Sequence, residues 1–330
     1  MEKLKVGVIG TGHLGKLHVK MFKAIENCEC VGVFDTNLIQ SETAASEYKV
    51  KYFATEEELL NAVDAVSIAV TTSAHYEVAN RCLEKGKHIF LEKPITSTIE
   101  EAEKIVKLSN KKKLNIQVGH IERFNSALVS LEKYISNPVF IETDRLSQFN
   151  PRGTDVAVVL DLMIHDIDVI LSFIKSDIKK IDANGVAVVS DNVDIANARI
   201  QFTNGAVANV TASRISQKKM RKMRIFQKDT YIALDFVTGA SEVYHLLPVD
   251  ENVSSGISFG EIGVGDKKKR LVYEQPQVKE INALQYELQL FVNSVLQKTK
   301  PLISGEDGLR ALKVADEIIK KIEESRIEIQ

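Results

Sequence analysis

The sequence contains few cysteines, and their pattern excludes two kinds of stabilising site. Only three occur in 330 residues, Cys28, Cys30 and Cys82. An odd number, without a Cys-x-x-Cys or Cys/His spacing, argues against a disulfide framework and against a zinc site. We therefore expect no bound metal and a reduced, cytoplasmic location for the protein.

Long apolar runs and an excess of positive charge are also absent. No segment approaches the roughly 20 apolar residues of a membrane-spanning helix, and the chain enters a strand-like segment at Leu4 without the pattern of a signal peptide. The formal net charge is -2, whereas nucleic-acid-binding surfaces normally carry a marked basic excess. We expect a soluble protein with neither a membrane nor a nucleic acid as partner.

The composition is that of an ordinary globular protein, with 44% apolar and 27% charged residues. The length of 330 residues is about twice that of a usual domain, which predicts two domains. Residues 1–120 alternate short Val/Ile-rich runs with helix-like segments, which is typical of a doubly wound parallel sheet and predicts an α/β fold. The expected strands are 6–9, 31–34, 65–70, 88–91 and 116–118, and the expected helices are 14–25, 41–47, 56–62, 75–85 and 99–110.

The pattern changes in residues 121–330. One helix is expected at about residues 155–174, strands follow it, and two amphipathic helices close the chain. Strands gathered after one helix predict a C-terminal α+β domain with an antiparallel sheet. The strands are expected at 183–189, 195–202, 206–212, 221–227, 231–236 and 241–247. We expect the closing helix, about residues 305–325, either to stay with this domain or to pack on the first.

The segment Gly10-Thr11-Gly12-His13-Leu14-Gly15 joins the first strand to the first helix. In a dinucleotide-binding turn the first glycine permits the bend, the second lets a pyrophosphate approach, and the third allows close helix packing. Free amides at the helix N-terminus then face the phosphates. We predict that these six residues bind a dinucleotide; the alternative is that the glycines only turn the chain.

Asp35 ends the second strand, about 20 residues beyond the glycine turn. A carboxylate there accepts hydrogen bonds from both adenosine ribose hydroxyls but repels a 2′-phosphate. Thr36 and Asn37 add no cation that would hold such a phosphate. The pattern favours NAD over NADP, with an ordinary turn aspartate as the alternative.

Glu92-Lys93-Pro94 ends the strand 88–91, at the sheet edge where ligands bind in such folds. Pro94 restricts Lys93 to an extended backbone. A lysine that is partly desolvated beside a cofactor can take or give a proton. The alternative is a surface lysine at the end of a strand.

Residues 161–168 carry a second candidate for proton transfer. At about 100° per residue, Asp161, His165 and Asp168 fall on one stripe of a helix. A neighbouring carboxylate can orient an imidazole and stabilise its protonated form. A solvated helix face, or a metal site without further ligands, remains the alternative.

Two further groups border the expected cleft. His120 and Arg123 follow the last strand of the first domain and are candidates for substrate contact, with Arg123 able to hold a phosphate; packing at a helix start is the alternative. The basic stretch 214–224 would either meet a negatively charged substrate or form a solvated hairpin edge. We favour the edge.

Together these motifs resemble the glucose–fructose oxidoreductase, inositol dehydrogenase and MocA (Gfo/Idh/MocA) family. The resemblance covers essentially the whole chain, from the glycine turn through residues 70–75, the Glu-Lys-Pro tripeptide and residues 161–168 to the closing helix. It implies an N-terminal Rossmann domain and a second domain with an open-faced, mostly antiparallel sheet. That sheet often forms the subunit interface in the family, which implies a homodimer or homotetramer.

The resemblance also implies hydride transfer at a sugar or cyclitol carbon. The catalytic residues would be Lys93, His165 and Asp161, which with His120 and Arg123 would contact the substrate. It implies cofactor contacts from four further residues, Thr71, Thr72, His75 and Glu92. Whether Lys93 or His165 is the base stays open.

Within the family, segments 118–125 and 160–168 are most similar to UDP-N-acetylglucosamine 3-dehydrogenases, which implies oxidation at C3 of that nucleotide sugar. Ser126 stands where those sequences usually carry proline, and Thr72 where the wider family usually has asparagine. An NAD-dependent glycosidase that oxidises C3 transiently is one alternative function. A non-catalytic, cofactor-sensing protein of the same fold is another, against which the presence of both Lys93 and His165 argues.

Overall fold

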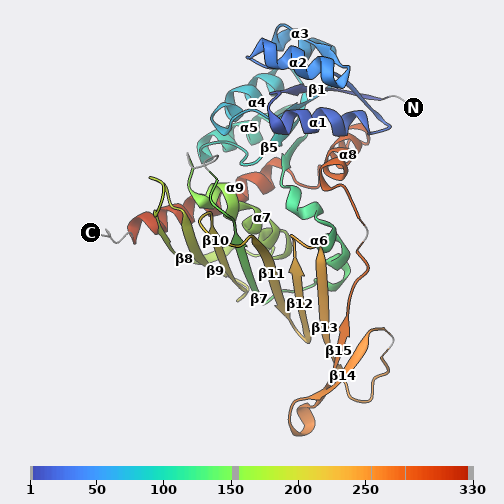
Figure 1. Ribbon diagram of the computed structural model, residues 1–330, viewed down its shortest axis with the longest axis vertical. Helices are drawn as coiled ribbons and strands as arrows, with labels where there is room; N and C mark the ends of the chain where they lie inside the picture. Colours follow the sequence, from blue (N-terminus) through green and yellow to red (C-terminus); the bar gives the residue numbers. More distant parts are fainter. Residues whose placement is uncertain (1–2, 151–155, 254, 279, 326–330) are drawn as a thin grey trace. The chain divides into compact units, whose positions relative to one another are not determined.

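The computed structural model describes residues 3–150, 156–253, 255–278 and 280–325, which divide into two compact units (Figure 1). The first unit comprises Met1–Ile121 and Asn282–Lys313, and the second comprises Glu122–Ile281 and Val314–Gln330. Sequence reasoning assigned residues 282–304 to the second domain, whereas they group with the first. Among the described residues, no helix combines the length and the apolar character that crossing a bilayer requires.

The first unit is built on a parallel sheet of six strands in the order β3-β2-β1-β4-β5-β6. The strands are β1 (Leu4–Ile9), β2 (Cys28–Phe34), β3 (Lys51–Tyr52), β4 (Ala65–Ile68), β5 (His88–Glu92) and β6 (Ile116–Gly119). From β1 the chain order runs outward to β2 and β3 on one side of the sheet, and from β4 to β6 on the other. The carboxyl ends of β1, β2 and β4 therefore form the crevice where ligands bind in such sheets. The predicted Rossmann sheet is confirmed; β3 was not predicted because it has only two residues.

The helices of this sheet are α1 (His13–Lys23), α2 (Leu38–Tyr48), α3 (Glu56–Ala62), α4 (His75–Glu84) and α5 (Ile99–Lys112). Thr55 and Thr98 begin α3 and α5 with a capping box, in which each side chain accepts from the third helical amide. These caps satisfy backbone donors that a helix start otherwise leaves without partners. They fix where the two helices begin, in agreement with the predicted starts at residues 56 and 99.

Helix α8 (Ala283–Leu296) lies beside α1 and completes the core of the first unit (Figure 1). Its residues Leu288, Phe291 and Val292 are buried against a cluster that includes Phe22 and Phe90. The Phe90 and Phe291 rings meet edge to face, with centroids 5.9 Å apart. The apolar periodicity of this helix indicates one buried face but not which sheet covers it. The sequence alone therefore assigned the helix to the second domain, whereas it groups with the first unit.

The second unit contains a nine-stranded sheet in the order β14-β15-β13-β12-β11-β7-β10-β9-β8. The strands are β7 (Phe140–Leu146), β8 (Ile178–Val186), β9 (Ile195–Phe202), β10 (Val207–Ser213), β11 (Met220–Gln227), β12 (Thr230–Asp235), β13 (Ala240–Pro248), β14 (Ile257–Ile262) and β15 (Lys269–Glu274). Among the described strands of this sheet, only β7 and β10 pair in parallel, so the mostly antiparallel character is confirmed.

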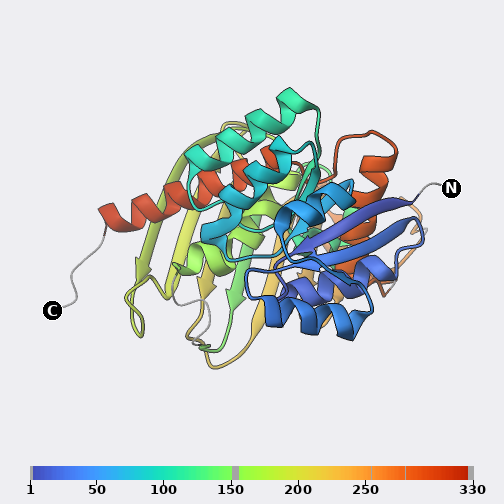
Figure 2. The same cartoon turned by 90° about the horizontal axis from the view of Figure 1, so that it is seen from above.

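One face of this sheet is covered and the other is open. Strands β7 and β9 alternate buried and accessible residues, as expected for a sheet packed on one side. Helix α7 (Ile164–Phe173) packs on β7 and β10, and both views place it along one face (Figures 1 and 2). The unit also contains α6 (Ser126–Leu131) and the last part of α9 (Gly305–Glu324), whose residues 305–313 belong to the first unit.

The interpretation of residues 214–224 as a solvated hairpin edge is wrong. Strand β11 lies inside the sheet, because β7 pairs with it on the side opposite β12. The sequence pattern does not indicate β7, whose residues 142–145 are all polar or charged, and without β7 strand β11 would be an edge.

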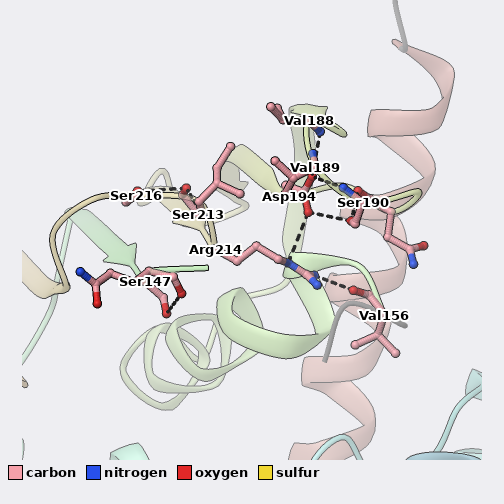
Figure 3. Close-up of polar contacts among 12 residues, drawn as sticks. Ser147, Val156, Val188, Val189, Ser190, Asp194, Ser213, Arg214 and Ser216 are labelled. Atoms are coloured by element: carbon pink, nitrogen blue, oxygen red, sulfur yellow. Dashed lines mark hydrogen bonds and ion pairs between the residues drawn. The ribbon is translucent and has the colours of Figure 1, made fainter. Parts of the chain in front are cut away.

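Arg214, the first cation of that basic stretch, is 4% exposed and has a structural role (Figure 3). Its Nη2 donates to the carbonyl oxygen of Val156 at 2.5 Å, and its Nε lies 3.8 Å from Asp194 Oδ1. Asp194 Oδ2 in turn accepts from the backbone N–H groups of residues 188–190, at 2.7 to 3.0 Å. Burial alone would raise the pKa of Asp194, but these hydrogen bonds lower it to about 2.

Candidate active site

The turn between β1 and α1 has a backbone geometry suited to a phosphate. Gly10 has a φ of +91°, and a Cβ there would lie 2.5 Å from the carbonyl oxygen of Ala69. A Cβ at Gly15 would lie 1.8 Å from the Gly10 carbonyl oxygen, so α1 packs directly against the turn. At Gly12 a Cβ would meet only Gln40 Nε2, at 3.9 Å, and no described side chain caps this helix start. The first-turn amides are therefore available to an anion.

Asp35 is tied to this turn by hydrogen bonds. Its Oδ2 accepts from the backbone N–H of Thr11 at 2.6 Å and from Thr11 Oγ1 at 3.1 Å, and its Oδ1 accepts from the Asn37 N–H at 2.9 Å. An ionised carboxylate offers about four acceptor positions. Three are used within the chain, and the remaining capacity suits a ribose hydroxyl.

A cavity of about 490 Å³ opens over these groups. Six of the residues predicted to bind the cofactor line it: Gly10, Gly12, His13, Leu14, Asp35 and Thr71. Thr11 is buried beneath the turn, where it donates to Asp35. The walls also include apolar Val70 and Val78. Open amides, a carboxylate and apolar walls in one cavity are the chemistry that the adenosine diphosphate half of a dinucleotide needs. The residues present therefore fit the cofactor.

Thr72 and His75 are not part of that lining among the described residues. Thr72 begins the short helix η1 (Thr72–Ala74). His75, at the start of α4, is 1% exposed, and its Nδ1 lies 2.8 Å from the carbonyl oxygen of Pro94. Burial lowers the pKa of His75 and so favours its neutral ring. His75 thus supports the turn after Lys93, and its contact with the cofactor stays a prediction.

Glu92 belongs to a buried chain of hydrogen bonds that the sequence analysis missed. His18 Nε2 lies 3.0 Å from Glu92 Oε1, and His18 Nδ1 lies 2.7 Å from Ser67 Oγ. Burial alone would raise the pKa of Glu92, but the hydrogen bond with His18 and the charge of Lys93 lower it below its usual range. A Cβ at Gly119 would lie 3.1 Å from the Glu92 carboxylate, so a glycine there leaves room for the charge. One signal in the sequence could have indicated this chain of hydrogen bonds: His18 is a polar residue on the buried face of α1.

Lys93 is half-buried at the carboxyl end of β5, and the Lys93–Pro94 peptide bond is cis. His120, just beyond β6, is also in the first unit and is 1% exposed. His165 and Asp161 belong to the second unit. The roles of all four in catalysis or substrate contact stay predictions.

A π-helical turn, η4 (Val159–Met163), precedes α7 and contains Asp161. The helix expected at residues 155–174 therefore begins at Val159 in the structure; Asp155 lies outside the described residues. A π turn bonds each residue to the fifth along the chain rather than the fourth. The uniform spacing that aligned Asp161 with His165 consequently does not hold across this turn. Such turns frequently occur at functional sites.

Two arginines, Arg123 and the buried Arg145, hold α7 through Asp166 and Asp168, which follow His165. Arg123 donates from Nε and Nη2 to the two oxygens of Asp168, at 2.7 and 2.6 Å. Asp168 was expected beside the imidazole of His165, but its carboxylate binds Arg123. Arg123 was itself expected to contact the substrate. The substrate contact of Arg123 stays a prediction.

The second arginine, Arg145 on β7, is 1% exposed. It donates to both oxygens of Asp166, at 2.7 and 2.9 Å, and to Glu122 Oε1 at 2.9 Å. Burial alone would lower the pKa of Arg145, but the two carboxylates raise it. Sequence reasoning missed this network because it missed β7.

Comparisons with known proteins agree with this architecture. Residues 4–120 match the model of the oxidoreductase family with an NAD-binding Rossmann fold, and residues 135–232 match the GFO/IDH/MocA C-terminal domain. A UDP-N-acetylglucosamine 3-dehydrogenase from Acidithiobacillus ferrooxidans is 34% identical over 324 residues, 98% of each chain. A solved structure of a UDP-N-acetylglucosamine 3-dehydrogenase from that organism has a TM-score of 0.87 at 33% identity, covering 98% of this chain and 99% of the other.

A myo-inositol 2-dehydrogenase from Thermotoga maritima is 24% identical, covering 98% of this chain and 97% of its own. The match at 34% identity extends over both units rather than over the Rossmann domain alone. With the two family models, it shows the expected family. The chain is a member of the GFO/IDH/MocA oxidoreductases, a dehydrogenase that uses a nicotinamide cofactor and acts on CH–OH donors.

Proposed function

We propose that the protein uses NAD to oxidise a sugar hydroxyl, with C3 of UDP-N-acetylglucosamine as the substrate carbon. The single observation that supports this substrate most is the 34% identity, over 98% of both chains, to a UDP-N-acetylglucosamine 3-dehydrogenase. The choice of a hydroxyl donor follows from the family.

The preference for NAD over NADP is supported by the chemistry around Asp35. Its carboxylate lines the cavity and is fixed by Thr11 and Asn37. A 2′-phosphate would approach this negative charge, and neither Thr36 nor Asn37 supplies a cation. A ribose hydroxyl instead donates a hydrogen bond to the carboxylate.

A nicotinamide cofactor held by the glycine turn and Asp35 would supply the acceptor for the hydride, with its electron pair, from the sugar carbon. A base on the chain, His165 or Lys93, takes the hydroxyl proton, so that the products are a ketone, the reduced cofactor and a proton. Such a proton transfer accelerates a reaction by roughly 10²- to 10⁴-fold. Asp161 is proposed to orient the imidazole of His165.

The open face of the second sheet is proposed as the interface of a homodimer or homotetramer. A row of aromatic rings crosses it: Phe226 and Tyr231 have centroids 4.8 Å apart, Tyr231 and Tyr244 5.4 Å, and Tyr244 and Tyr273 5.2 Å. Tyr231 alternates along β12 with buried residues, on the face that α6 contacts, and so lies on the opposite face. Apolar patches of this kind commonly mark protein interfaces. Light scattering of the purified chain measures its subunit number directly.

A substrate screen tests the proposed activity. The purified chain is incubated with NAD and, in separate reactions, UDP-N-acetylglucosamine, free N-acetylglucosamine and myo-inositol, while the absorbance of NADH is followed. We expect NADH to form with the nucleotide sugar, and much less NADPH to form when the same reactions are supplied with NADP. Cleavage of a glycoside without net NADH would support the NAD-dependent glycosidase instead. Tight NADH binding without any turnover would support the cofactor-sensing alternative.

A further inference from the structure

We propose that the ion pair between Glu56 and Arg81 recognises the adenine base of the cofactor. The inference rests on the proposed use of NAD and goes beyond it, because it assigns a base-reading site to two residues outside the dinucleotide motif. Both side chains line the same cavity as Gly12 and Asp35. Once the glycine turn is assigned to the pyrophosphate and Asp35 to the ribose, Glu56 and Arg81 are the acidic and basic residues that remain in the described lining of that cavity.

The pair has a fixed geometry. Arg81 Nε donates to Glu56 Oε1 and Arg81 Nη2 donates to Glu56 Oε2, both at 2.8 Å. Glu56 opens α3 and its side chain is 17% exposed, whereas Arg81 lies near the end of α4 and its side chain is 49% exposed. The hydrogen bond with Glu56 raises the pKa of Arg81. A bidentate contact of this kind holds the guanidinium plane in one orientation.

The free positions of this pair match one edge of adenine. A guanidinium has five N–H donors and a carboxylate about four acceptor positions, and the two bonds between Glu56 and Arg81 leave donors and acceptors side by side. Adenine presents an amino donor next to a ring-nitrogen acceptor. The amino group would donate to Glu56 and the ring nitrogen would accept from Arg81. Apolar Val78 and Ala74 in the same lining supply surface for the faces of the ring.

A neighbouring ion pair provides a matched control. Lys85 Nζ lies 2.7 Å from Glu57 Oε1, so this pair also joins α4 to α3. Its side chains are 49% and 68% exposed, and neither belongs to the described lining of the cavity. Glu57→Gln therefore removes a tie between the same two helices without touching the site. A purely structural role for Glu56 would give the two variants the same phenotype.

The experiment titrates the full chain with three reduced nicotinamides and follows their own fluorescence, which is convenient because the chain has no tryptophan. The probes are NADH, its analogue with hypoxanthine in place of adenine, and reduced nicotinamide mononucleotide, which lacks the adenosine half. Hypoxanthine carries a carbonyl acceptor where adenine has its amino donor. The proteins are the wild type, Glu56→Gln, Arg81→Gln and Glu57→Gln, each checked by its melting temperature.

We expect the wild type to bind NADH about tenfold more tightly than the hypoxanthine analogue, within the range for a bidentate base contact. In Glu56→Gln and Arg81→Gln this ratio should fall toward one, while affinity for the mononucleotide is unchanged and Glu57→Gln behaves as the wild type. Each of three results would overturn the inference. The first is a ratio near one in the wild type, and the second is an equal loss of NADH affinity in Glu56→Gln and Glu57→Gln. The third is that Glu56→Gln gains NADPH binding but keeps its preference for adenine. These outcomes leave NAD binding itself intact, whereas a wild type that binds no NADH would overturn the proposed function as well.

Discussion

Asp35 Oδ2 accepts a hydrogen bond from the backbone N–H of Thr11 at 2.6 Å. The residue proposed to bind the adenosine ribose thus also holds the glycine turn that faces the pyrophosphate. Two parts of the cofactor would therefore depend on one carboxylate.

Replacement of this carboxylate should weaken NAD binding and relax the choice of cofactor. Asp35→Ser removes the hydrogen-bond acceptor of Thr11 and the charge that repels a 2′-phosphate. A hydrogen bond to a charged group contributes about 1.5–3 kcal/mol, so NADH affinity should fall roughly 10- to 100-fold, at about 1.4 kcal/mol per factor of ten. Fluorescence titration with NADH and NADPH measures both effects. Unchanged discrimination between the two cofactors would remove Asp35 from that role.

Two glycines of the turn should respond differently to alanine. A Cβ at Gly15 would lie 1.8 Å from the Gly10 carbonyl oxygen, whereas one at Gly12 meets nothing closer than 3.9 Å. Gly15→Ala should therefore destabilise the fold, by about 1–3 kcal/mol as for other overpacked sites. Gly12→Ala should keep the melting temperature but lose NADH affinity, because its methyl group occupies the place of the pyrophosphate. The idea fails if Gly12→Ala binds NADH as the wild type does.

The ion pairs of Arg145 should matter more for folding than for cofactor binding. Arg145→Met leaves Asp166 and Glu122 buried without the guanidinium that both contact. Breaking a buried ion pair by removing one partner typically costs about 3–5 kcal/mol. Chemical denaturation should show a loss of that size, while the surface variant Glu57→Gln provides a control with little change. A loss no larger than in the control would contradict the account.

Stability should depend on pH through Asp194. Its pKa is lowered to about 2 in the folded chain from an ordinary value of 3.8, so its contribution to stability is present above the unfolded pKa and is lost as the pH falls toward 2. The shift corresponds to about 2 kcal/mol. The free-energy difference between the wild type and Asp194→Asn should therefore shrink between pH 5 and pH 2. A difference that stays constant over this range would show that Asp194 acts without its charge.

Local sequence patterns predicted those helices, strands and turns whose characteristic residues are adjacent in the sequence. The strand, glycine turn and helix around Gly12 follow from adjacent residues, and so does the alternation of strands and helices in the first 120 residues. Strand β7 was not predicted because its sequence, Phe-Ile-Glu-Thr-Asp-Arg-Leu, has four successive polar or charged residues and lacks the apolar/polar alternation of a half-buried strand. That omission led to the wrong interpretation of β11 as part of an edge.

Contacts between distant residues could not be predicted in the same way. His18 and Glu92 are separated by 74 positions, and their contact depends on β1, β4 and β5 lying side by side. Arg123 was predicted to contact the substrate and Asp168 to lie beside His165, but no pattern in the sequence indicated that the two bind each other. The π turn at Val159–Met163 likewise has no simple sequence signal, and a uniform helical spacing overlooks it.

The most direct test of the central claim compares NADH formation by the wild type and His165→Ala with UDP-N-acetylglucosamine as substrate, with NADH affinity measured in parallel. Because the imidazole is proposed to move a proton and not to hold the cofactor, the variant should lose at least about 100-fold in turnover while its NADH affinity stays the same. Full turnover by His165→Ala, or a wild type that reduces no NAD with this sugar, would contradict the account.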